Sequence, residues 1–99
     1  MWVLRTITEG LPEKTFRLPP GTIRTLGRAA GADFIVDAAL VSRVHCRFTA
    51  MADGGLEVRD LESTNGTFVN GQRTDVARLA SGDKVQIGRV EVVALRDAD

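Results

Sequence analysis

The sequence is poor in the residues that build disulfides and metal sites. Its 99 residues include one cysteine, Cys46, and one histidine, His45. A lone cysteine excludes a disulfide framework within the chain, and one Cys with one His falls short of the ligand set of a zinc site. We therefore expect no metal and no other cofactor.

An excess of charge of either sign is also missing. The 13 basic side chains balance the 13 acidic ones, so the formal net charge is zero. This balance does not imply a general surface for nucleic acid or an anionic membrane, and we expect neither as a partner. Lys14 and Lys84 are the only lysines. Arginine binds phosphate and carboxylate in bidentate fashion better than lysine does, although the bias also fits a GC-rich genome.

Long apolar runs are absent as well. No segment is long enough to span a bilayer, and none looks like the apolar region of a signal peptide. We therefore expect a cytoplasmic protein. The length of 99 residues and the 43% hydrophobic content indicate one domain, residues 1–99, with a modest core. Residues 96–99 resemble the start of a linker, which would make the domain a module of a longer chain.

Short alternating segments, bounded by glycine and proline, make up most of the chain. The alternation predicts strands at residues 2–7, 14–18, 22–26, 34–36, 44–49, 56–61, 84–87 and 91–95. In the segment 44–49, Val44, Cys46 and Phe48 would share the core face. Residues 72–81 are expected to be irregular. Many short strands with regular turns and no helix predict an all-β antiparallel sandwich.

Two Asn-Gly pairs stand close together, and they constrain the local structure. Asn65-Gly66 and Asn70-Gly71 are separated by only three residues. Asn-Gly favours a two-residue hairpin turn, because both residues tolerate a positive φ. Two hairpins cannot share a strand of three residues, so one pair is expected in a shaped loop and the other in an ordinary turn.

Catalytic arrangements find little support. Ser42 and His45 are close in sequence, but residues three apart on a strand point to opposite faces, and no Gly-x-Ser-x-Gly motif is present. His45 would then be a hydrogen-bonded structural histidine. Cys46 falls on an apolar face and is expected in the core. No phosphate-binding loop of the Gly-x-x-x-x-Gly-Lys-Ser/Thr type appears. We expect no enzyme.

Several residues in the predicted loops could together bind a single anion. Arg28 follows a strand, Ser42-Arg43 precedes another, and residues 63–65 (Ser-Thr-Asn) lie in a third connection. Loops of a sandwich can meet at one end, where arginine, hydroxyl and backbone N–H groups would bind a dianion such as a phosphate ester. The alternative is that the arginines are solvated surface charges and that the serines bond their own turns.

At these residues the chain resembles the forkhead-associated (FHA) domain family. The matching segments, in order, are Leu26-Gly27-Arg28, Asp33-Phe34-Ile35-Val36, Val41-Ser42-Arg43-Val44-His45, residues 60–71 and residues 79–88. The resemblance implies a sandwich of about eleven strands with its binding loops at one end. It also implies binding of phosphothreonine in partner proteins.

The resemblance assigns a role to each site residue. Arg28 would contact the phosphate, the Ser42 hydroxyl would donate to it, and Thr64 would add a further contact. Asn65 would hold the peptide backbone beside the phosphothreonine, and Arg43 would contact phosphate or peptide.

Structural support of the site is implied for four more residues. Gly27 and Gly66 would permit the turns, His45 would brace the binding loops, and Asn70 would be a turn residue. Leu40 stands where some members read the third residue after the phosphothreonine, which would favour an apolar residue there. The alternative is a leucine that only packs under its loop.

Phosphothreonine-dependent interaction in Ser/Thr kinase signalling is therefore the leading hypothesis, with a kinase or its substrate as partner. One alternative is a phosphorylation-independent interaction domain that uses a sheet face. Another is an enzyme built on Ser42 and His45.

Overall fold

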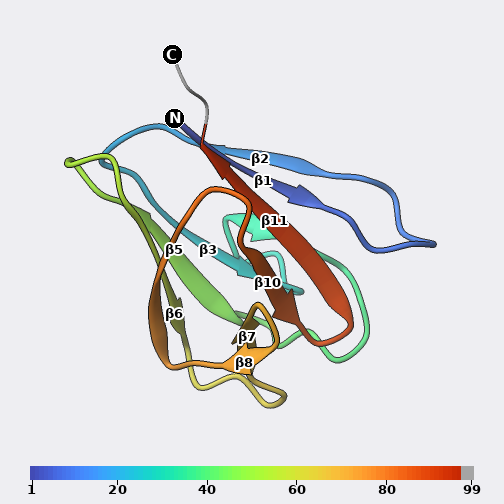
Figure 1. Cartoon of the computed structure of the whole chain (residues 1–99). Helices are drawn as coiled ribbons and strands as arrows, with labels where there is room; N and C mark the ends of the chain where they lie inside the picture. Colours follow the sequence, from blue (N-terminus) through green and yellow to red (C-terminus); the bar gives the residue numbers. More distant parts are fainter. Residues whose placement is uncertain (97–99) are drawn as a thin grey trace.

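The computed structural model describes residues 1–96, which form eleven strands in two sheets (Figure 1). The strands are β1 (Trp2–Thr6), β2 (Thr15–Leu18), β3 (Ile23–Gly27), β4 (Phe34–Ile35), β5 (Cys46–Ala50), β6 (Leu56–Asp60), β7 (Thr67–Val69), β8 (Gln72–Arg73), β9 (Val76–Leu79), β10 (Lys84–Ile87) and β11 (Val90–Arg96). The predicted all-β sandwich is confirmed. The predicted linker start extends into residues 97–99, which lie outside the described residues.

The two sheets have the strand orders β2-β1-β11-β10-β7-β8 and β4-β3-β5-β6-β9. Trp2 pairs with Arg96, so the ends of β1 and β11 lie side by side, and Figure 1 shows them at the top of the molecule. The turn between β10 and β11 lies towards the opposite end. The loops that follow β3, β4 and β6 all leave strands of the second sheet, so paired strands hold the starts of these loops.

The core lies between the sheets and follows the alternation of the sequence. Alternate residues of β5 are buried, namely Cys46, Phe48 and Ala50, and β11 does the same with Val90, Val92 and Ala94. Apolar area buried in this way stabilises a fold by about 25 cal/mol per Å². Phe16 of β2 stacks on Phe34 of β4, with ring centroids 4.5 Å apart, and so joins the edges of the two sheets.

One pair of strands departs from the predicted antiparallel arrangement. β3 and β4 are parallel, with Leu26 beside Phe34. The Asp33 carboxylate accepts hydrogen bonds from the backbone N–H of Thr25 (2.9 Å) and from its hydroxyl (3.2 Å). Asp33 therefore holds the end of the β3–β4 connection beside β3, directly before β4 begins.

Two further predictions were wrong. Residues 72–81, expected to be irregular, contain β8 and β9. These strands bury only Leu79, because both lie at sheet edges, so they lack the apolar alternation that marks a half-buried strand. Val44 does not share the core face of β5. It is 38% exposed, whereas the neighbouring His45 is fully buried.

The second Asn-Gly pair forms the expected ordinary turn. Val69 of β7 pairs with Gln72 of β8, and Asn70 and Gly71 between them have φ values of 50° and 84°. Two consecutive positive φ angles are those of a type I′ hairpin. The Asn70 side chain also accepts a hydrogen bond from the Lys84 N–H (2.9 Å), which ties this hairpin to the start of β10.

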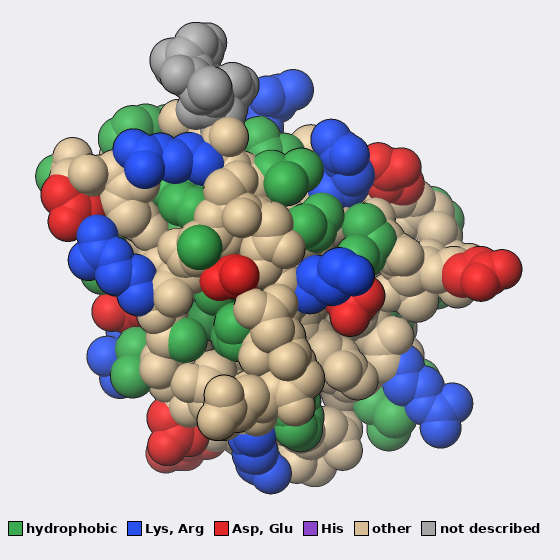
Figure 2. Space-filling view, in the orientation of Figure 1, with side chains coloured by type: hydrophobic (Ala, Val, Ile, Leu, Met, Phe, Trp, Pro, Cys, Tyr) green, Lys and Arg blue, Asp and Glu red, His purple; other side chains and the backbone are tan. Residues whose placement is uncertain are grey.

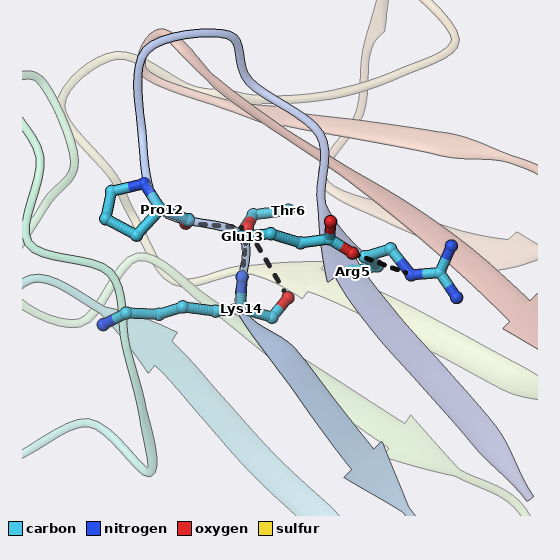
Figure 3. Close-up of polar contacts among 5 residues, drawn as sticks. All are labelled: Arg5, Thr6, Pro12, Glu13 and Lys14. Carbon is cyan, nitrogen blue, oxygen red and sulfur yellow. Dashed lines mark hydrogen bonds and ion pairs between the residues drawn. The ribbon is translucent and has the colours of Figure 1, made fainter.

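The connection between β1 and β2 is held by the contacts drawn in Figure 3. The Thr6 hydroxyl oxygen accepts a hydrogen bond from the Lys14 N–H (2.7 Å), and Arg5 pairs with Glu13 (3.4 Å). The ion pair is solvent-exposed, and such pairs contribute at most about 1 kcal/mol. The connection is therefore organised mainly by the Thr6 side chain.

The face of the molecule in Figure 2 shows basic and acidic side chains interspersed among apolar and polar atoms, in agreement with the zero net charge. Residues 1–96 form no helix long and apolar enough to cross a membrane.

Candidate functional site

Three loops meet in one open groove with a volume of about 600 Å³. They are the loop after β3, the loop between β4 and β5, and the loop between β6 and β7. The lining residues are Arg28, Ala39, Leu40, Val41, Ser42, Arg43, Val44, Glu62, Thr64 and Asn65. All five residues predicted to bind a phosphopeptide are among them, although they are spread over 38 positions of the sequence (28 to 65).

Arg28 is held at the groove by its own backbone and by its side chain. Its backbone N–H donates to the Ser42 carbonyl (3.0 Å), and its Nε–H donates to the Val41 carbonyl (3.0 Å). The second bond fixes the guanidinium group and leaves the two terminal NH₂ groups for a ligand. Because Arg28 is exposed, an incoming anion would meet a guanidinium group that is already oriented.

Ser42 links two of the loops through its hydroxyl group. The Ser42 Oγ accepts a hydrogen bond from the Thr64 N–H (3.0 Å), which leaves the hydroxyl hydrogen free to be donated. Arg43, the next residue, accepts a bond from the Ala29 N–H at its carbonyl (3.1 Å), and its side chain is exposed at the groove. The loops of Arg28 and Ser42 are thus joined through their backbones.

His45 braces two of the loops from inside the protein. Its Nδ1 accepts a hydrogen bond from the Ser42 N–H (3.0 Å), so Nε2 carries the proton and donates to the Gly66 carbonyl (2.8 Å). The ring is fully buried in this arrangement. The contacts that the predicted bracing role requires are present, and Gly66 adopts a φ of 88°, which glycine tolerates best.

The pairing of Ser42 and His45 differs from that of a hydrolase. The imidazole bonds the Ser42 backbone and not its hydroxyl, and both ring nitrogens already have partners. A general base must be free to accept the proton of the nucleophile. This geometry therefore offers no support for the alternative of a catalytic Ser-His pair.

Asp60 organises the loop between β6 and β7. Its carboxylate accepts hydrogen bonds from the Ser63 N–H (3.1 Å), the Ser63 hydroxyl and the Thr67 hydroxyl (2.7 Å). Ser63 Oγ in turn accepts a bond from the Gly66 N–H (2.9 Å). Partial burial raises the pKa of Asp60, but the hydrogen bonds from Ser63 and Thr67 outweigh it, and the pKa lies below its usual value. Asp60 is therefore ionised at neutral pH and holds the loop that carries Thr64 and Asn65.

The two predicted ligand residues of this loop are both exposed. Asn65 donates from Nδ2 to the Leu40 carbonyl (2.9 Å), which ties this loop to the one before β5. The same amide retains a carbonyl oxygen and a second N–H, the pair of groups that can bond an extended peptide backbone. Thr64 also lines the groove.

Leu40 is shaped by a contact that the sequence does not reveal. It has a φ of 71°, which is unusual for leucine, and its side chain is 47% exposed in the groove and not packed beneath its loop. Gly88, in the turn between β10 and β11, lies directly under it, and a Cβ atom at Gly88 would stand 2.8 Å from the Leu40 carbonyl. The hydrogen bond from Asn65 and the close approach of Gly88 together fix the backbone of Leu40, whose apolar side chain lines the groove.

Gly27 permits the closest approach in the site. A Cβ atom at this position would lie 2.2 Å from the Arg43 carbonyl oxygen. The backbones of β3 and of the loop before β5 can therefore come together only because residue 27 has no side chain. Asn70 differs from the other predicted support residues, since its side chain bonds Asp83 and Lys84, neither of which lines the groove.

Sequence reasoning did not name four of the lining residues as site residues, Ala39, Val41, Val44 and Glu62. Glu62 has a φ of 55° and is the single acidic residue in the lining. Its position one residue before Ser63 was the only available signal. Residues 1–96 contain no group of three or more acidic, His or Cys side chains that could hold a metal ion.

The chain matches a known protein family and is similar to curated proteins and solved structures. A model of the FHA domain matches residues 24–88. The chain is 47% identical over 79 residues to the ABC transporter ATP-binding/permease protein Rv1747 of Mycobacterium tuberculosis, covering 80% of this chain and 9% of that protein. It spans less than half the length of the curated relatives it matches.

Two of the similar solved structures match this chain over nearly its full length. One comes from a structural and functional analysis of phosphothreonine-dependent FHA domain interactions, with 28% identity, a TM-score of 0.88 and coverage of 99% of this chain and 98% of that one. The other is the FhaA FHA domain complexed with the intracellular domain of Rv3910, with 29% identity, a TM-score of 0.84 and coverage of 95% and 99%.

Proposed function

Because the chain belongs to the FHA domain family, we propose that it is a phosphothreonine-dependent interaction module that binds phosphorylated partner proteins and has no catalytic role. The partner would be a substrate of a Ser/Thr kinase or the kinase itself. The observation that carries the proposal is the convergence of Arg28, Ser42, Arg43, Thr64 and Asn65 on one open groove.

The groups in the groove match the chemistry of a phosphate monoester. Phosphothreonine carries a charge of about −1.5 to −2 and three acceptor oxygens at neutral pH. The free NH₂ groups of Arg28, the Ser42 hydroxyl and the Thr64 hydroxyl are donors, and Arg43 adds positive charge. These residues would bind the phosphate, and Asn65 would bond the peptide backbone.

The energy available from these groups is sufficient. A hydrogen bond to a charged group contributes about 1.5–3 kcal/mol, and micromolar affinity needs about 8 kcal/mol. Three or four such bonds reach this value without a deep pocket. Little of it would be lost to ordering, because His45, Asp60 and Asn65 already hold the loops in place.

Titration of a phosphothreonine peptide library, with unphosphorylated and phosphoserine versions of each peptide, tests the proposal. We expect micromolar binding of phosphothreonine peptides only. Arg28→Ala should weaken it roughly 10- to 150-fold, the equivalent of one charge-assisted bond. Arg17→Ala is the matched control, because Arg17 is exposed on β2 and does not line the groove.

Phosphorylated and unphosphorylated peptides that bind equally would overturn the proposal, as would an Arg28→Ala variant with full affinity. Binding that survives both phosphatase treatment and Arg28→Ala would favour the alternative of a phosphorylation-independent sheet face. A pH series adds a second test. Affinity should rise as the pH passes about 6, where the phosphate loses its second proton.

A further inference from the structure

Glu62 is a charge in the groove that phosphate binding does not use. Its carboxylate would repel a phosphate dianion, yet Glu62 lines the same groove as Arg28 and Arg43. Among residues 1–96, the ion pairs within 4 Å are Arg5 with Glu13, Arg59 with Glu57 and Arg78 with Asp53. The groove therefore contains positive and negative charges that do not neutralise one another by direct pairing.

The backbone holds Glu62 in place from both sides. The Leu61 N–H donates to the His45 carbonyl (3.0 Å), and the Ser63 N–H donates to the Asp60 carboxylate (3.1 Å). Between these two hydrogen bonds Glu62 adopts a φ of 55°, a backbone conformation that residues other than Gly, Asn and Asp rarely take. The direction of its Cα–Cβ bond is thus set by the same network that positions Thr64 and Asn65.

A ligand that pairs with the two arginines and with Glu62 must itself carry both negative and positive charge. Resting on the function proposed above, we infer that Glu62 is a specificity residue that selects a lysine or arginine close to the phosphothreonine in the bound peptide. An acidic side chain at that position would face the Glu62 carboxylate and be disfavoured. The ligand class is therefore a phosphothreonine peptide with a basic flanking residue.

The expected size of the effect follows from the exposure of Glu62. Exposed ion pairs contribute little, and rim charges act mainly on specificity. We expect Lys to be preferred over Glu by about two- to fivefold at one flanking position, in a buffer of low salt. The preference should shrink towards 1 M salt, where the Debye length is about 3 Å.

The test uses the tightest phosphothreonine peptide from the library titration. Single Lys and single Glu substitutions are placed at each of the three positions on either side of the phosphothreonine, and affinities are measured by fluorescence anisotropy. The proteins are wild type, Glu62→Gln, Glu62→Lys and the control Glu9→Lys. Glu9 is an exposed glutamate in the turn after β1 and does not line the groove. Thermal unfolding checks that each variant is folded.

At one position, wild type and Glu9→Lys should both prefer Lys. Glu62→Gln should show no preference there, and Glu62→Lys should prefer Glu. The inference is overturned if peptides bind but no position favours Lys, or if Glu62→Gln keeps the wild-type preference, and the proposed function then still stands. If no peptide binds better than its unphosphorylated version, the proposed function fails, and the inference fails with it.

Discussion

Replacing Gly27 by alanine tests whether the backbone contact beneath the groove positions the binding loops. The added Cβ would lie 2.2 Å from the Arg43 carbonyl oxygen and 2.8 Å from the Cα of Val44. An ordinary contact needs about 3.5 Å, so the backbone at residues 43 and 44 must move by roughly 1 Å. Overpacking of this kind typically costs about 1–3 kcal/mol.

This loss of stability lowers the midpoint of thermal unfolding, Tm. For a domain of this size each kcal/mol lowers the Tm by about 4–8 °C, so we expect a loss of about 5–20 °C. The peptide affinity at 25 °C should also fall by about tenfold or more, because the Arg28 N–H and the Ala29 N–H are bonded to the Ser42 and Arg43 carbonyls. Moving these carbonyls displaces the phosphate-binding groups.

Gly31→Ala is the matched control, since it makes the same substitution four residues later. A Cβ at Gly31 would have no neighbouring atom within 4 Å, and the residue has no positive φ. We expect stability within about 0.5 kcal/mol of wild type, or a small gain. The reasoning is refuted if Gly27→Ala unfolds at the wild-type midpoint, or if Gly31→Ala loses as much stability as Gly27→Ala.

Three further predictions concern His45 and Asp60, which support the groove, and the core residue Cys46. His45→Ala should cost about 2–5 kcal/mol in urea unfolding, because the Ser42 N–H and the Gly66 carbonyl would each lose a partner; a loss below 1 kcal/mol would contradict the bracing role. The pKa of Asp60 is lowered by folding, so its contribution to stability is present above its unfolded pKa of about 3.9 and is lost as the pH falls through the folded value. Asp60→Asn should therefore lose less stability than wild type between about pH 5 and pH 2, and an unchanged dependence would show that Asp60 is not responsible. Burial, with a smaller effect from the charge of Asp60, raises the pKa of the Cys46 thiol, so a thiol reagent at pH 8 should react at least about 1000-fold more slowly with the native protein than in urea; rapid native labelling would disprove the buried position.

The agreement between sequence and structure differs from one feature to another for physical reasons. Strands with one buried face were predictable, because alternation is the direct result of burying every second side chain, as Cys46, Phe48 and Ala50 show. The edge strands β8 and β9 escaped prediction, because they bury only Leu79. The Asn70-Gly71 turn was predictable from local backbone preference, and β7 has room for only that one hairpin.

Some residues of the candidate site could also be predicted from the sequence, and others could not. The residue types that can bind a phosphate ester are visible in the chain, and the spacing of the motifs around Arg28, Ser42 and Asn65 carries the family resemblance. The residue types of Ala39, Val41, Val44 and Glu62 do not mark them as groove-lining, since their presence in the groove depends on how three loops converge.

The β-rich pattern, the turns and the groups able to bind an anion can be read from the amino-acid sequence. Those properties arise from neighbouring residues and from side-chain chemistry. Which groups meet, as in the bond from Arg28 to the Val41 carbonyl, depends on the tertiary structure. The same holds for where two backbones approach closely, as at Gly27 and Gly88. Such contacts join residues far apart in the chain, and they form only when the packing of both sheets brings the loops together.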